Sequence, residues 1–135
     1  MDADFSEVMQ LAADLESAPS GIAPKLAKAL GVTANLVKQD ARKSVRRRKG
    51  LGHAAHSINY DLVGVSGPVS SMSAEIGYDK NGAGHLGNLI EFGAPNAGNQ
   101  LAPSHDLGNA LLNNEDDFVR GVERAVADAM REVNL

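Results

Sequence analysis

Four histidines, His53, His56, His85 and His105, are the only side-chain nitrogen ligands in this chain that suit a transition metal. There is no cysteine, which excludes disulfides and thiolate ligands. His53 and His56 are three residues apart in a glycine-bounded segment, and no acid separates them. The helix with two histidines four apart that zinc proteases use is absent. We therefore expect no metal and no cofactor, and keep a metal-dependent hydrolase as our third functional hypothesis.

Other catalytic arrangements are equally weak. Ser57, His56 and Asp61 could be drawn as a hydrolytic triad, but no nucleophile elbow accompanies them. The glycine-rich stretch 82–87 is not followed by the Gly-Lys-Ser/Thr of a phosphate-binding loop. We expect a protein that is not an enzyme.

The strongest functional signal is a basic run. Six of the 13 basic residues lie within eight positions: Arg42, Lys43, Arg46, Arg47, Arg48 and Lys49. On a helix, residues four apart share a face, so two such pairs project together. The run is either a solvated helix end or an electrostatic contact with an acidic partner surface or double-stranded DNA. With two Tyr, three Phe and no Trp, a stacking platform for single strands is poorly supplied.

A second signal is the glycine-rich segment 84–93, whose apolar residues cannot all face water. Gly84 and Gly87 allow conformations that a Cβ would penalise, and Gly93 is a natural stop for a short helical turn. Glu91 is either splayed to solvent or paired with an arginine across an interface, and we favour pairing because an unpaired buried carboxylate is costly. The segment is interpreted as an assembly device, with four residues as its candidate docking site: Leu89, Ile90, Glu91 and Phe92.

Hydrophobic periodicity supplies the elements that must position these residues. A length of 135 residues suits a single domain spanning residues 1–135. Asp106 and Asn114 are candidate helix caps. We expect an α+β fold in which a small antiparallel sheet of two to four strands packs against a long N-terminal-half helix and a C-terminal amphipathic helix. The expected elements are helices at 4–16, from 22 into the basic run and from 106, a short turn within 84–93, a hairpin at 56–65 and 70–78, and a final helix at 115–133.

The net charge of −4 is unevenly distributed. The N-terminal segment is acidic, and a second acidic knot occupies 115–117, which suggests directed contacts with charged neighbours. No run reaches the roughly 20 apolar residues that span a bilayer. The acidic N-terminus differs from a secretory signal. We therefore expect a soluble protein made in the cytoplasm, with no membrane partner.

The order of these pieces resembles the tail-completion, or head–tail joining, proteins of long-tailed bacteriophages with non-contractile tails, the "tail component" family. The series consists of a basic helix end with a Gly-Leu step, a Ser-Ile pair opening a strand, a strand with an Ile-Gly step, a Glu-Phe-Gly turn, and a proline-histidine loop before a leucine-rich turn. In this sequence the series occupies 46–51, 57–61, 74–78, 86–93 and 103–111. Lys49 replaces a common threonine, and Ser104 and Asp106 spread the proline-histidine-proline loop.

The resemblance implies a structural virion protein in the neck or tail of the phage particle, assembled in the host cytoplasm. It implies a homo-oligomeric ring of six subunits at the head–tail junction, through which DNA passes. Adjacent neck proteins and tail-tube or terminator proteins would be its partners. The alternatives are a tail terminator ring that caps the tail tube, or an accessory protein that binds double-stranded DNA.

Overall fold

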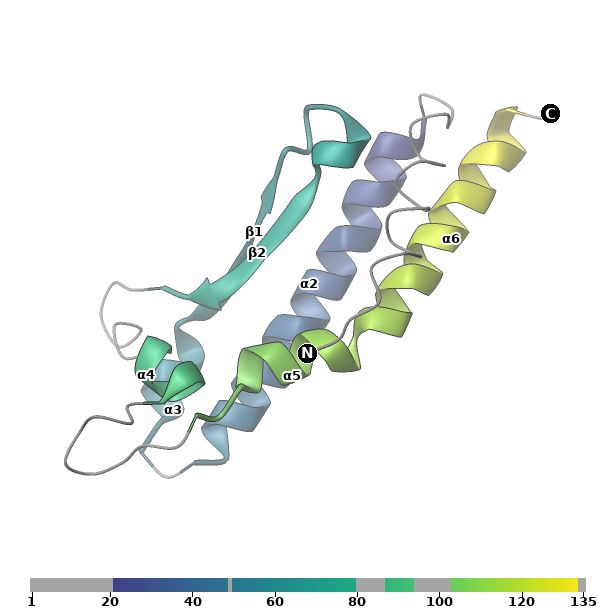
Figure 1. Cartoon of the computed structure of the whole chain (residues 1–135). Coiled ribbons are helices and arrows are strands. Elements are labelled where there is room, and N and C mark those ends of the chain that lie inside the picture. Colours follow the sequence, from purple (N-terminus) through teal and green to yellow (C-terminus); the bar gives the residue numbers. More distant parts are fainter. Residues whose placement is uncertain (1–20, 49, 80–86, 94–102, 134–135) are drawn as a thin grey trace. The chain divides into compact units, whose positions relative to one another are not determined.

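The computed structural model describes residues 21–48, 50–79, 87–93 and 103–133, and it has the expected α+β fold (Figure 1). Two hydrogen-bonded antiparallel strands form the sheet in the described residues. The predicted helix at 4–16 lies outside them. The elements are α2 (Ile22–Arg46), α3 (Gly52–His56), β1 (Ile58–Val63), the short 3-10 helix η1 (Val69–Ser71), β2 (Ser73–Tyr78), α4 (Gly87–Phe92), α5 (Asp106–Asn113) and α6 (Glu115–Val133).

The chain divides into two compact units, and helix α2 contributes residues to both. Among the described residues, the first unit comprises 21–33, 62–74 and 116–133. The second comprises the remainder, from 34 to 61 and from 75 to 115.

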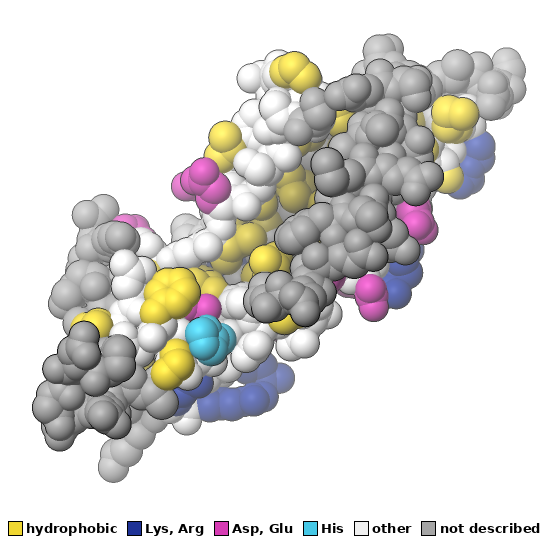
Figure 2. Space-filling model, in the orientation of Figure 1, with side chains coloured by type: hydrophobic (Ala, Val, Ile, Leu, Met, Phe, Trp, Pro, Cys, Tyr) yellow, Lys and Arg dark blue, Asp and Glu magenta, His cyan; other side chains and the backbone are white. Residues whose placement is uncertain are grey.

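The core of the first unit forms where the start of α2 meets α6. Ile22 and Leu26 of α2 are buried with residues at positions 122, 125 and 129 of α6, which recur at helical spacing. Val69 and Met72, from the connection between the strands, pack against this cluster. Acidic and basic side chains alternate along the outer edge of α6 (Figure 2), where Arg120 pairs with Asp117 and Arg131 with Asp128. The predicted amphipathic helix at 115–133 is confirmed.

The core of the second unit forms where the later turns of α2 meet the hairpin. Val37, Ala41 and Val45 are spaced four apart and so lie on one face of the helix. They pack with Ile58 of β1 and with buried alanines of α3 and α5. Ala41, Val45 and Ile58 are 0% exposed, so this seam holds the hairpin on the helix.

The predicted hairpin is confirmed, but the short helix α3 was not predicted. The sequence pattern predicts a strand from residue 56, whereas His56 is the last residue of α3 and β1 begins at Ile58. Arg42 explains the difference, because its Nε donates to the Ile58 carbonyl at 2.9 Å and its Nη2 to the His56 carbonyl at 3.2 Å. Ser57 Oγ also donates to the Ala54 carbonyl at 2.6 Å. These bonds satisfy carbonyls at the end of α3 and at the first residue of β1, a role that hydrophobic periodicity does not reveal.

Candidate assembly site

The predicted docking residues lie on α4, and Glu91 is anchored in the interior. It is 6% exposed, and its two carboxylate oxygens accept backbone N–H bonds from Leu107 at 2.8 Å and Gly108 at 3.2 Å. These N–H groups belong to the first turn of α5, which has no intrahelical partner for them. Glu91 therefore caps α5 from another element, and neither of the two expectations for this acid describes it.

Asp106 was expected to cap α5, and this was wrong. It is the first residue of α5, and the preceding His105 makes no side-chain capping bond. Asp106 is 3% exposed, and its carboxylate instead accepts hydrogen bonds from Ser44 and Arg48 near the end of α2. Its Oδ1 lies 2.5 Å from Ser44 Oγ and 3.1 Å from Arg48 Nη2, and its Oδ2 lies 2.5 Å from Arg48 Nη1.

The loop before α5 completes this network and fastens α4 to it. The backbone N–H of Ser104 donates to the Ile90 carbonyl at 3.2 Å, and that of His105 donates to the Glu91 carbonyl at 3.1 Å. Ser104 Oγ lies 2.7 Å from both the Ile90 carbonyl and Asp106 Oδ2. A hydroxyl has one proton, so it donates to one of these acceptors at a time. The segment 104–107, which leads into the first turn of α5, thus connects α4 and α5 with the end of α2.

The electrostatics follow from this burial. Burial would raise the pKa of Asp106, but the hydrogen bonds from Arg48, Ser44 and Ser104 together outweigh it, so the pKa is lowered. The stability that this carboxylate contributes is present above its ordinary pKa and is lost as the pH falls through its lowered pKa. The hydrogen bond to Asp106 likewise raises the pKa of Arg48.

Tyr78 borders the same interior. Burial, followed by the negative charges of Asp106 and Glu91, raises its pKa to about 12. Its buried hydroxyl has no hydrogen-bond partner in the part of the chain that the structure describes. A buried hydroxyl without a partner lowers the free energy of unfolding, so the Tyr78 hydroxyl is a destabilising group.

Glycines set the start and the end of α4. A Cβ on Gly87 would lie 2.3 Å from Cγ of Tyr78, so the first turn of α4 rests directly on the tyrosine ring. Close approach, and not an unusual backbone angle, is therefore the observed reason for Gly87. Gly93 has φ +77° and donates its N–H to the Leu89 carbonyl at 2.8 Å, which confirms it as the helix stop. Gly84 lies outside the described residues.

The anchored helix presents two apolar side chains outward. Ile90 and Glu91 are each 6% exposed, whereas Leu89 is 43% and Phe92 65% exposed. Residues three apart lie on the same side of a helix, so Leu89 and Phe92 form one exposed apolar edge of α4. An exposed apolar edge on a fixed support has the chemistry of a contact surface.

The basic run divides into two groups. Arg42 and Arg48 bind groups of this chain: Arg42 binds the His56 and Ile58 carbonyls, and Arg48, whose side chain is 41% exposed, binds the buried Asp106. Lys43 and Arg46 are exposed on the last turns of α2, and Arg47 is exposed directly after the helix; none of the three makes an ion pair with another described residue. Lys43 and Arg46 are three apart and share one side of the helix, and Arg47 follows Arg46 directly. Lys49 lies outside the described residues. The structure thus brings Arg48 to the network around Glu91 and Asp106, and leaves three cations facing solvent.

Within the described ranges, no three His, Asp or Glu side chains are grouped so that they could hold a metal ion. No helix in those ranges is long and apolar enough to cross a membrane. The chain matches no protein-family model, no curated protein and no solved structure.

Proposed function

We propose that this protein is a non-enzymatic structural subunit of the neck of a tailed bacteriophage, a tail-completion protein that forms a homo-oligomeric ring at the head–tail junction. The resemblance of the ordered motifs to the tail-component family suggests the role, and six subunits are expected from that family. One observation carries the proposal: the Glu-Phe-Gly turn is fixed from inside by Glu91 and offers Leu89 and Phe92 outward.

This construction suits a ring subunit. A contact that must close a ring requires a defined direction, because small angular errors accumulate around the circle. The N–H bonds to Glu91 and the backbone bonds from Ser104 and His105 hold α4 by its buried face. The exposed edge can then meet a neighbouring subunit or an adjacent neck protein without first becoming ordered.

The exposed cations suggest which face of the subunit meets the DNA that passes through the ring. Lys43, Arg46 and Arg47 offer a positive face with no aromatic platform beside them in the sequence. Contacts of this kind with phosphates carry no sequence information and depend on salt. We propose that this face lies along the path of the passing double-stranded DNA, where weak contacts would let the duplex slide.

The decisive experiment is electron microscopy of particles made in host cells by a phage that lacks this protein. Complete heads beside complete, unjoined tails of normal length are expected. Overlong tails would instead assign the alternative role of tail terminator. Normally joined, infectious particles would reject the proposal.

Variants refine this test through the two exposed surfaces. Leu89→Ser with Phe92→Ser should abolish joining, whereas Val63→Ser, at an exposed apolar position of β1, should not. Charge reversal at Lys43, Arg46 and Arg47 should reduce infectivity more than reversal at the exposed Arg131 of α6. Equal effects within either pair of variants would remove that surface from the proposal.

The same cations favour a second candidate, an accessory protein that binds double-stranded DNA by itself. It predicts binding by the isolated subunit that weakens steeply between two salt concentrations in a gel-shift titration. A ring that touches DNA only inside the particle predicts weak binding at both concentrations.

A further inference from the structure

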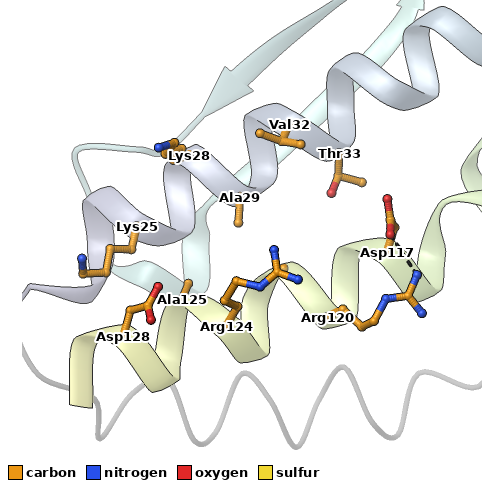
Figure 3. A pocket seen from close by; sticks show the side chains of 11 residues that line it. Lys25, Lys28, Ala29, Val32, Thr33, Asp117, Arg120, Arg124, Ala125 and Asp128 are labelled. Atoms are coloured by element: carbon orange, nitrogen blue, oxygen red, sulfur yellow. Dashed lines mark hydrogen bonds and ion pairs between the residues drawn. The ribbon is translucent and has the colours of Figure 1, made fainter. Parts of the chain in front are cut away.

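A groove in the first unit is separate from the surfaces described above. It lies between the first three turns of α2 and helix α6, with a volume of about 380 Å³ (Figure 3). Its middle is lined by the small residues Ala29, Gly121 and Ala125. A Cβ on Gly121 would lie 3.7 Å from that of Ala29, so the two helices approach closely there.

The charged residues around the groove leave an excess of positive charge. Lys25, Lys28, Arg120 and Arg124 line it, against the two acids Asp117 and Asp128. Most of these charges have partners: Lys25 with Glu132 at 2.8 Å, Arg120 with Asp117 at 2.9 Å, and Asp128 with Arg131 at 2.9 Å.

Two cations and one apolar side chain in the groove are available to bind another segment. Lys28 and Arg124 have no ion pair with the residues that the structure describes, and Arg124 extends from α6 toward α2 (Figure 3). Val32, also in the lining, is 55% exposed. The groove therefore suits an amphipathic segment with acids beside an apolar stripe.

The chain contains one such segment, at residues 2–16. It has five acids and no Lys or Arg: Asp2, Asp4, Glu7, Asp14 and Glu16. Its apolar residues recur at the spacing of one helix face: Phe5, Val8, Leu11, Ala12 and Leu15. These residues lie outside the described part of the chain, so only their sequence enters the argument.

We propose that the groove between α2 and α6 binds the acidic segment 2–16 of a second copy of this chain. Charge complementarity selects the segment, and Val32, which is 55% exposed in the groove lining, offers a contact for its apolar face. A head-to-tail contact needs two different, complementary patches on every subunit. The segment and the groove are such patches, and the inference rests on the proposed ring.

Disulfide trapping tests which segment occupies the groove. Because the chain has no cysteine, only the introduced cysteines can form the cross-link. Full-length Glu7→Cys protein mixed with full-length Lys28→Cys protein should give a cross-linked dimer on a non-reducing gel. Each variant alone should give far less. In the double variant, chains linked to one another support the proposal, whereas only an internally linked monomer overturns it.

Charge reversal tests the electrostatics by light scattering on the full-length protein. Lys28→Glu with Arg124→Glu should raise the concentration needed for assembly by about tenfold or more, because like charges would then face each other. Glu123→Lys, outside the groove lining on the same helix, should change it little. Adding Asp4→Lys and Glu7→Lys to the reversed groove should restore assembly.

The outcomes separate this inference from the proposed function. Normal assembly of the reversed-groove variant together with absent cross-links would overturn the segment–groove contact, while the head–tail joining experiment would still decide the neck role. Cross-links between copies combined with normal joining in phage lacking the protein would support the contact and reject the neck role.

Discussion

The two units of the chain use charge in opposite ways. On α6 the charges lie on the surface, as in the pair of Arg120 with Asp117, whose side chains are 63% and 49% exposed. Around α5 the acids Glu91 and Asp106 are buried and engaged by several donors. Exposed pairs contribute little to stability, whereas a buried carboxylate is tolerated only where its partners are in place. The surface charges are therefore free to serve recognition, and the interior charges determine where α4 and α5 lie.

The sharpest way to break this comparison is Asp106→Ala. It removes the acceptor shared by Arg48, Ser44 and Ser104, and we expect a loss of about 2–3 kcal/mol in the free energy of unfolding, since Arg48 can still reach water. Urea denaturation measures it. Asp117→Ala, the matched change on the surface, should cost less than about 0.5 kcal/mol. Equal losses of unfolding free energy in the two variants would mean that burial of the carboxylate does not determine its contribution to stability.

A smaller effect is expected at Glu91. Glu91→Ala leaves the first N–H groups of α5 without their acceptor and should cost about 1–2 kcal/mol. Hydrogen exchange should accelerate at the amides of Leu107 and Gly108. Asp116→Asn, an exposed acid in the first turn of α6, is the control and should leave exchange in α5 as it was. Unchanged protection in the Glu91 variant would refute the cap.

The smallest expected effect, and one of opposite sign, is at Tyr78. Tyr78→Phe removes a buried hydroxyl without a described partner and should stabilise the protein by about 1 kcal/mol at neutral pH. Because folding raises the pKa of Tyr78 to about 12, the wild type should lose stability as the pH rises from its ordinary value of 10 toward 12. The variant should lack this loss in alkaline denaturation scans, whereas Tyr60→Phe should retain it. Destabilisation by Tyr78→Phe at neutral pH would show that the hydroxyl has a partner.

Local patterns predicted the described elements well, because each long element has a periodic apolar face. The stripe from Val122 to Ala129 defines α6, and the alternation around Ile58 and Ile76 defines the hairpin. Helix α3 was missed because five residues are too few to show a period, and its end depends on Arg42.

The interior of the candidate site could not be predicted in the same way. Its bonds join residues far apart in the chain: Glu91 and Leu107 are separated by 16 positions, Arg48 and Asp106 by 58. Ser44 and Asp106 are separated by 62, and no single sequence reveals such a pairing. Asn114 shows the same limit, since its amide donates to Asp40 Oδ2 from 74 positions away. Sequence reasoning selected Glu91 and Asp106 as acids of interest, and the fold supplied their partners.

The backbone at His105 has a consequence for which sequences this architecture accepts. It is the one described residue other than glycine with a positive φ, at φ 51° and ψ 33°. Asn and Gly tolerate that geometry, whereas a β-branched side chain resists it. Substitutions at position 105 should therefore be confined to a few residue types because of the backbone angle, independently of any role of the imidazole side chain. The backbone conformation of one residue thus limits which related sequences can keep the ion pair between Asp106 and Arg48.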